Sequence, residues 1–130
     1  MSQTLRVLIA DDTLVMRTTL KFMLTNLGYS DITEATNGLE AWTKLSAAEP
    51  PFDLILCDQN MPECTGIEFL KKLRADVKFT KTPCLMVTSE GDRDFLLEAL
   101  RAGANDIAIK PVTIEVLKTK IENTVKKAKG

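Results

Sequence analysis

The stretch FDLILCDQNMP, residues 52–62, contains the feature from which the fold can be worked out. Its first half, FDLILC, is a short and nearly continuous apolar run, which is typical of a buried strand. Asp58 follows at the end of this run, and Pro62 prevents a simple continuation of the strand. A carboxylate in such a place is costly unless a cation or a hydrogen-bond donor compensates its charge. The stretch therefore predicts a buried strand that ends at a charged site.

Similar apolar runs alternate with segments of helical periodicity along the rest of the chain. This alternation favours an α/β fold, a doubly wound parallel sheet of five strands with helices on both of its faces. The spacing of Trp42 places it on the core side of a helix rather than in a binding site. The predicted strands cover residues 5–10, 31–35, 53–57, 83–89 and 106–110, and the predicted helices cover 13–27, 38–48, 66–75, 92–102 and 112–128.

The composition indicates one globular domain, which we place at residues 1–130. A net charge of −1 gives no reason to expect binding to nucleic acid. No apolar run approaches the roughly 18 residues that a membrane span requires, and the N-terminus lacks the pattern of a signal peptide. Three cysteines, two of them inside apolar runs, fit a reduced cytoplasmic protein. We expect Cys57 and Cys84 to be buried and Cys64 to be exposed in the loop after Asp58.

The chain contains no histidine, which limits the chemistry that it can perform. This absence excludes nucleophiles activated by histidine and metal sites built on imidazole. Any reaction must therefore use carboxylates, hydroxyls, thiols or lysine.

Polar residues gather at the carboxyl ends of the predicted strands, where ligands bind in open parallel sheets. That polar residues merely mark the ends of strands is a sufficient explanation for one strand, but not for four together. Glu34, at the end of the second strand, is less informative. The informative polar residues at the strand ends are Asp11 and Asp12 after the first strand, Asp58 after the third, Thr88 and Ser89 at the end of the fourth, and Lys110 at the end of the fifth.

Three neighbouring carboxylates repel one another unless a cation lies among them. Mg²⁺ suits this position, because it needs few protein carboxylates and accepts a phosphate oxygen as a further ligand. Lys110 adds a second positive charge. The metal and the lysine would offset charge on phosphoryl oxygens while Asp58 attacks in line, and Thr88 would donate a hydrogen bond to one of these oxygens. The cluster therefore predicts phosphoryl transfer to a carboxylate.

Four segments in this order resemble the receiver domains of two-component response regulators, and most closely those that act alone in chemotaxis. The segments are ADDTLVMR, DQNMPECTG, PCLMVTSEG and AGANDIAIKP, and the resemblance covers the whole chain. It implies a flavodoxin-like sheet with the strand order 2-1-3-4-5. It also implies a protein that is not a metabolic enzyme but catalyses its own phosphorylation and dephosphorylation.

The resemblance implies a role for each residue of the reacting group. Asp58 corresponds to the phosphoacceptor, Thr88 to the switch hydroxyl and Lys110 to the partner of the phosphoryl group. The peptide bond between Lys110 and Pro111 is expected to be cis, which is affordable only before proline.

The resemblance also implies one Mg²⁺ per chain. Its ligands would be Asp12 directly, Asp11 through water, Asp58, and the backbone carbonyl of Asn60. Asn60 and Glu90 flank the expected path of water to the phosphoryl group. Both can order a water molecule, so we expect relatively fast self-dephosphorylation.

By this resemblance the chain is a cytoplasmic, monomeric signalling switch. A histidine kinase or a phosphotransfer protein would phosphorylate it, and it would then change its binding to an effector protein, with the flagellar motor switch as the first candidate. A phosphorelay or a regulator outside chemotaxis is the alternative, because Ile107 stands where many relatives carry Tyr or Phe. The expected output face comprises Arg93, Leu96, Ile107, Val112, Val116 and Lys120.

Three other functions agree with the fold class but less well with the residues. A scaffold that is never phosphorylated would not need the acidic pair, Asp58, Thr88 and Lys110. A flavin or nucleotide binder would need glycines in the first strand-to-helix turn, which instead reads ADDTLVM. A phosphatase acting on metabolites would need a longer chain to supply a substrate cap.

Overall fold

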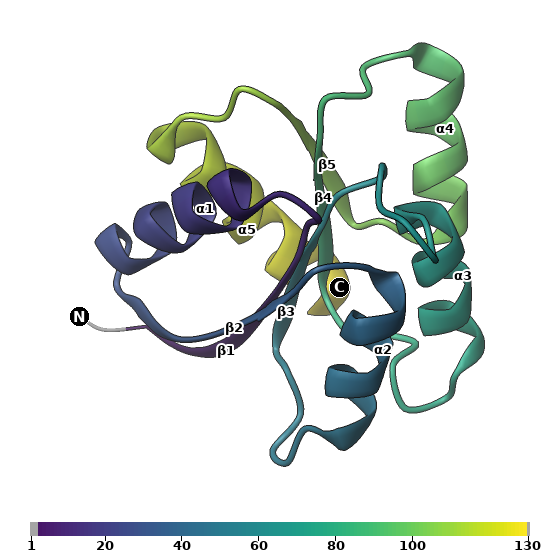
Figure 1. Ribbon diagram of the computed structural model, residues 1–130, viewed down its shortest axis with the longest axis horizontal. Coiled ribbons are helices and arrows are strands. Elements are labelled where there is room, and N and C mark those ends of the chain that lie inside the picture. Colours follow the sequence, from purple (N-terminus) through teal and green to yellow (C-terminus); the bar gives the residue numbers. More distant parts are fainter. Residues whose placement is uncertain (1–2, 130) are drawn as a thin grey trace.

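A five-stranded parallel sheet forms the centre of the computed structural model, which describes residues 3–129 and the side chains of residues 5–128 (Figure 1). The strands are β1 (Gln3–Ala10), β2 (Tyr29–Ala35), β3 (Leu54–Cys57), β4 (Cys84–Thr88) and β5 (Asp106–Ile109). The helices are α1 (Leu14–Asn26), α2 (Gly38–Ala47), α3 (Gly66–Ala75), α4 (Arg93–Ala102) and α5 (Ile114–Lys129). The strands follow the order β2-β1-β3-β4-β5, so the predicted doubly wound fold is confirmed.

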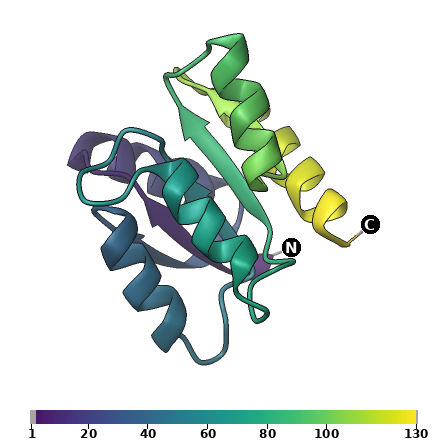
Figure 2. The same cartoon turned by 90° about the vertical axis from the view of Figure 1, so that its right-hand side faces the viewer.

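Helices cover both faces of the sheet, with α1 and α5 on one side and α2, α3 and α4 on the other (Figures 1 and 2). Side chains of one strand alternate between the two resulting cores. In β1, Val7 and Ile9 pack with α1 and α5, whereas Leu8 and Ala10 pack on the opposite side. Full burial of an aliphatic side chain of this size contributes about 1.5–3 kcal/mol. The two cores together therefore fix the sheet between its helical layers.

Side-chain caps begin the helices at the edge of the sheet where the strands end. Thr13, Asn37, Thr65 and Asp92 each accept a hydrogen bond from a backbone N–H in the first turn of α1, α2, α3 and α4, respectively. Such caps satisfy backbone donors that the helix leaves unpaired. The caps therefore fix the ends of the loops that carry the polar strand-end residues.

The burial of the cysteines agrees with the prediction for two residues and contradicts it for the third. Cys57 and Cys84 are buried in strands, and burial raises the pKa of Cys84 to about 12. Cys64 was expected to be exposed, but it is buried as well. Its loop folds inward against the start of α2, where a Cβ added to Gly38 would lie 2.7 Å from the Cys64 Cβ. The exposure prediction was wrong because the packing of this loop depends on α2.

Trp42 lies on the inner side of α2, as its spacing predicts. Its ring meets the rings of Phe69 and Phe79 edge to face, at centroid distances of 6.3 and 5.6 Å, and the ammonium group of Lys72 lies 4.9 Å from the Trp42 centroid. In the described part of the chain, no helix is both long and apolar enough to cross a membrane.

Candidate functional site

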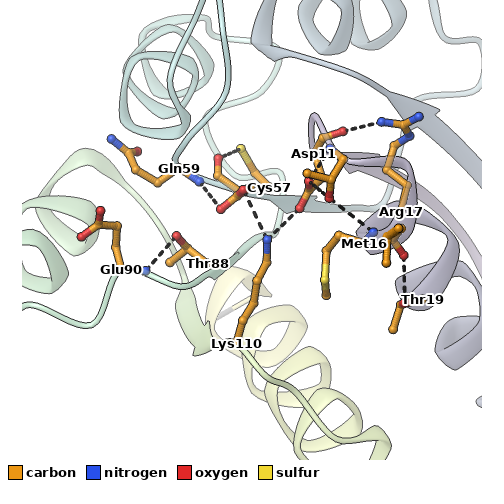
Figure 3. Close-up of polar contacts among 12 residues, drawn as sticks. Asp11, Met16, Arg17, Thr19, Cys57, Gln59, Thr88, Glu90 and Lys110 are labelled. Carbon is orange, nitrogen blue, oxygen red and sulfur yellow. Dashed lines mark hydrogen bonds and ion pairs between the residues drawn. The ribbon is translucent and has the colours of Figure 1, made fainter.

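The polar residues that follow β1, β3, β4 and β5 meet at one edge of the sheet (Figure 3). Asp11 comes directly after β1 and Asp58 directly after β3, Thr88 ends β4, and Lys110 comes directly after β5. Because β1, β3, β4 and β5 are adjacent and parallel, their carboxyl ends share this edge. The fold thus brings together side chains that are far apart in the sequence.

Lys110 lies between two buried carboxylates. Its Nζ is 2.9 Å from Asp11 Oδ2 and 3.3 Å from Asp58 Oδ2, while Asp11 is 1% exposed and Asp58 is 7% exposed. Burial by itself would lower the pKa of Lys110, but the contacts with Asp11 and Asp58 outweigh it and raise the pKa above its ordinary value. The ammonium group therefore remains protonated at neutral pH and offsets part of the acidic charge.

The loop after β1 holds Asp11 from several directions. Asp11 Oδ1 accepts hydrogen bonds from the backbone N–H of Thr13 at 3.0 Å and from its hydroxyl at 3.1 Å. The Asp11 N–H donates to the carbonyl of Ala35 in β2, and the Asp11 carbonyl accepts from Arg17 Nη1 at 2.8 Å. Thr13 was not singled out from the sequence, and neither was Arg17, although both lie in the ADDTLVMR segment.

Asp58 is fixed by its own loop and by β1. Its backbone N–H donates to the carbonyl of Ala10, and its Oδ1 accepts from the N–H of Gln59 at 2.7 Å. The Gln59 side chain in turn accepts from the N–H of Ile67 at the start of α3. Gly66 allows this close approach, because a Cβ there would lie only 2.4 Å from the Asp58 carbonyl oxygen. The role of Gln59 depends on tertiary contacts and could not be inferred from the sequence pattern.

Thr88 and Lys110 are coupled through the backbone. Thr88 is buried, its hydroxyl oxygen accepts from the N–H of Glu90 at 3.2 Å, and its carbonyl accepts from the N–H of Lys110 at 2.8 Å. The Lys110–Pro111 peptide bond is cis, as predicted. The hydrogen of the Thr88 hydroxyl can still be donated to a ligand oxygen.

The acidic residues fit a hard divalent cation. Asp11, Asp12 and Asp58 each offer a carboxylate oxygen, and these oxygens lie within 4.8 Å of one another. Asp12 is exposed, so the cluster opens to solvent on one side. Carboxylate oxygens with room for water molecules are the ligands that Mg²⁺ prefers. Asn60, the fourth predicted ligand, lies in the loop after Asp58 with an exposed side chain.

The expected output face is only partly a surface. Arg93 and Val116 are exposed, and Leu96 and Lys120 are half-buried. Ile107 and Val112, however, belong to the two buried cores. Ile107 is buried because β5 places it on the side of the sheet that α4 covers, and Val112 because it belongs to the core between the sheet and helices α1 and α5. The expectation that these two side chains are exposed was wrong, although Ile107 still lines a hollow on this face.

Comparison with known proteins places this geometry in a family. The model of the "Response regulator receiver domain" matches residues 7–122. The chain belongs to the response regulator receiver family. Among curated relatives of this family, chemotaxis protein CheY1 of Helicobacter pylori strain J99 is 42% identical over 118 residues, which cover 91% of this chain and 94% of the relative.

Solved receiver structures have the same fold. Chemotaxis protein CheY4 of Vibrio cholerae matches with a TM-score of 0.85 and 33% identity, covering 94% of this chain and 99% of that one. CheY in the CheX-CheY-BeF3-Mg²⁺ complex of Borrelia burgdorferi matches with a TM-score of 0.83 and 26% identity, covering 90% and 86%. Membership of this receiver family supports a phosphorylation-activated switch of two-component signalling, and the acidic cluster is consistent with Mg²⁺ binding.

Proposed function

We propose that this receiver accepts a phosphoryl group on Asp58 from a phosphohistidine. The observation that carries the proposal is the position of the Asp58 carboxylate, which lies 3.3 Å from the Lys110 ammonium and within 4.8 Å of the oxygens of Asp11 and Asp12. An Asp58 oxygen attacks phosphorus, the bond between phosphorus and the histidine nitrogen breaks, and an aspartyl phosphate forms. The nitrogen keeps the electron pair of the broken bond.

The residues around Asp58 have separate tasks in this proposal. Asp11, Asp12, Asp58 and the Asn60 carbonyl would hold Mg²⁺, which when bound supplies positive charge to the phosphoryl oxygens. Lys110 supplies further positive charge, and the Thr88 hydroxyl donates a hydrogen bond. Asn60 and Glu90 order the water that later hydrolyses the acyl phosphate.

The surface beside the site suits a protein as phosphoryl donor. Leu14 is 66% exposed and Val15 is 79% exposed, and both lie in the first turn of α1, next to the Asp11–Thr13 loop. Contiguous exposed apolar side chains can mark a surface that contacts another protein. They support a histidine kinase or a phosphotransfer protein as the partner, and such a partner is consistent with action in the cytoplasm.

The output of the switch is proposed to be a change in protein binding at α4, β5 and α5. A hollow of about 320 Å³ on this face is lined by Leu96, Leu100, Asp106, Ile107, Ile109 and Lys120. Its apolar floor suits a side chain of an effector protein. Similarity to CheY proteins of chemotaxis favours the flagellar motor switch as that effector. A phosphorelay or another regulatory partner is the second candidate, because the residue at position 107 is isoleucine and not an aromatic residue.

Phosphorylation with a small donor tests the proposal directly. We expect acetyl phosphate and Mg²⁺ to add one phosphoryl group to the intact chain, as measured by mass spectrometry. The Asp58→Asn variant should gain none, whereas Asp53→Asn, which changes an exposed carboxylate, should be modified like the unaltered chain. A phosphoryl group that still attaches to the Asp58→Asn variant would refute the proposal.

A further inference from the structure

Arg17 makes a contact that the proposed reaction does not use. Its Nη1 donates to the backbone carbonyl of Asp11 at 2.8 Å (Figure 3). Its Nε donates to Glu34 Oε1 at 3.2 Å. The Arg17 side chain is only 12% exposed. A guanidinium group that is held on two sides in this way has a fixed orientation, because its donors form a rigid fork.

Glu34 connects this contact to the sheet. It lies in β2, and in the register of β1 and β2 it is the partner of Ile9, while Ala35 is the partner of Ala10. Asp11, the residue that follows β1, donates its N–H to the Ala35 carbonyl at 3.1 Å. β2 therefore holds Asp11 twice: directly at its N–H, and through Glu34 and Arg17 at its carbonyl.

We propose that the Glu34–Arg17 pair is a positioning device for the Mg²⁺ ligands Asp11 and Asp12. It fixes the peptide group that joins these two residues, because the Asp11 carbonyl belongs to that peptide. The inference rests on the proposed function, since it assumes that these carboxylates bind Mg²⁺. Residues that orient metal ligands in this way change metal affinity about 10–100-fold when they are removed.

Simple electrostatics predicts that removal of Arg17 has the opposite effect on Mg²⁺ affinity. Arg17 carries a positive charge close to the cation site, and a positive charge repels Mg²⁺. If Arg17 acts only through its charge, its removal must tighten Mg²⁺ binding. If it acts by positioning, its removal must weaken Mg²⁺ binding although a repulsive charge has been lost. The direction of the effect thus separates the two explanations.

The experiment measures Mg²⁺ affinity by calorimetric titration of the intact, unphosphorylated chain. We expect Arg17→Met to weaken binding about tenfold. Arg17→Lys keeps the positive charge but lacks the planar guanidinium group that donates to both partners, so it should weaken Mg²⁺ binding as well. Lys21→Met is the matched control. Lys21 lies on α1 like Arg17 and pairs with Glu34 at 3.7 Å, but it is not needed to hold the Asp11 carbonyl. The Mg²⁺ affinity of this variant should stay within about twofold of that of the unaltered chain.

The outcomes are distinguishable. Unchanged or tighter binding in Arg17→Met, or full affinity in Arg17→Lys, would overturn the positioning role while leaving the proposed function intact. Failure of the unaltered chain to bind Mg²⁺ would refute the proposed function itself. Urea denaturation of each variant without metal shows whether it is folded, and Arg17→Lys provides the decisive titration if Arg17→Met does not fold.

Discussion

Lys110 Nζ lies 2.9 Å from Asp11 Oδ2, although the two residues are 99 positions apart in the sequence. Together with the contact to Asp58, this places one ammonium group between two acids that follow different strands. The amine is thus in position to stabilise charge that develops on a phosphoryl group at Asp58.

Replacement of Lys110 by alanine is expected to slow phosphorylation by acetyl phosphate about 100-fold, because removal of one such donor has an effect of this order. Mg²⁺ binding should persist, since the carboxylates remain. The initial rate at saturating Mg²⁺ is the measurement. Lys118→Ala, which removes an exposed lysine from α5, should react at the normal rate, and an equally normal rate for Lys110→Ala would contradict the role of the amine.

Gly66→Ala should destabilise the protein by about 1–3 kcal/mol, as overpacking does elsewhere. The added Cβ would lie 2.4 Å from the Asp58 carbonyl oxygen and 3.0 Å from the Gln59 Cα, and backbone atoms cannot easily move away. Urea denaturation measures the change in the free energy of unfolding. Gly91→Ala is the control, because a Cβ there would meet only Ile109 Cγ2, at 3.9 Å, which is an ordinary van der Waals distance. Equal stability of the two variants would show that the contact at Gly66 is not tight.

Val15→Ser should reduce phosphoryl transfer from a phosphohistidine protein about tenfold but leave phosphorylation by acetyl phosphate unchanged. The side chain is 79% exposed, so its loss removes contact area from a docked partner without disturbing the core. The measurement is the rate with each donor, using a phosphotransfer protein that is active on the unaltered chain. Val77→Ser is the matched control, since Val77 is also highly exposed but lies in the loop after α3. Equal losses with both donors would argue against docking at α1.

Alkaline pH should destabilise the protein through Tyr29, the single tyrosine of the chain. Burial, and then the negative charge of Glu122, raise the pKa of Tyr29. The folded state thus favours the neutral phenol, so this contribution to stability is complete below about pH 10, the ordinary tyrosine pKa, and is lost as the pH rises through the raised pKa.

Near-ultraviolet absorbance follows this titration for Tyr29 alone. Tyr29→Phe should remove the corresponding part of the alkaline loss in the free energy of unfolding. Ionisation of Tyr29 in the folded protein at the ordinary tyrosine pKa would contradict the predicted effect of burial on its pKa.

The sequence predicted the elements well because their periodicity reflects local burial. The alternation of apolar runs and helical segments indicated the parallel sheet, while the strand order came from the resemblance to receivers. β2 begins at Tyr29 rather than at residue 31, because pairing with β1 continues to Gln3. Such an extension is determined by the partner strand and leaves no signal in the pattern of β2 itself.

The candidate site was predictable only to the extent that strand ends reveal it. Asp11, Asp12, Asp58, Thr88 and Lys110 could be grouped because each follows or ends a predicted strand, and their reaction roles stay predictions. Contacts between loops were not accessible in this way. The inward packing of Cys64, the burial of Val112 in the core between the sheet and helices α1 and α5, and the bridge from Glu34 through Arg17 to Asp11 all depend on how neighbouring elements meet in space.

The burial of Cys57, Cys64 and Cys84 has a practical consequence for following the switch. None of these thiols is presented to a maleimide dye in the folded protein. A cysteine introduced at the exposed position Val116 would therefore be labelled selectively, without prior removal of the native cysteines. A fluorophore at that position would report on the α4, β5 and α5 face in an otherwise unaltered chain.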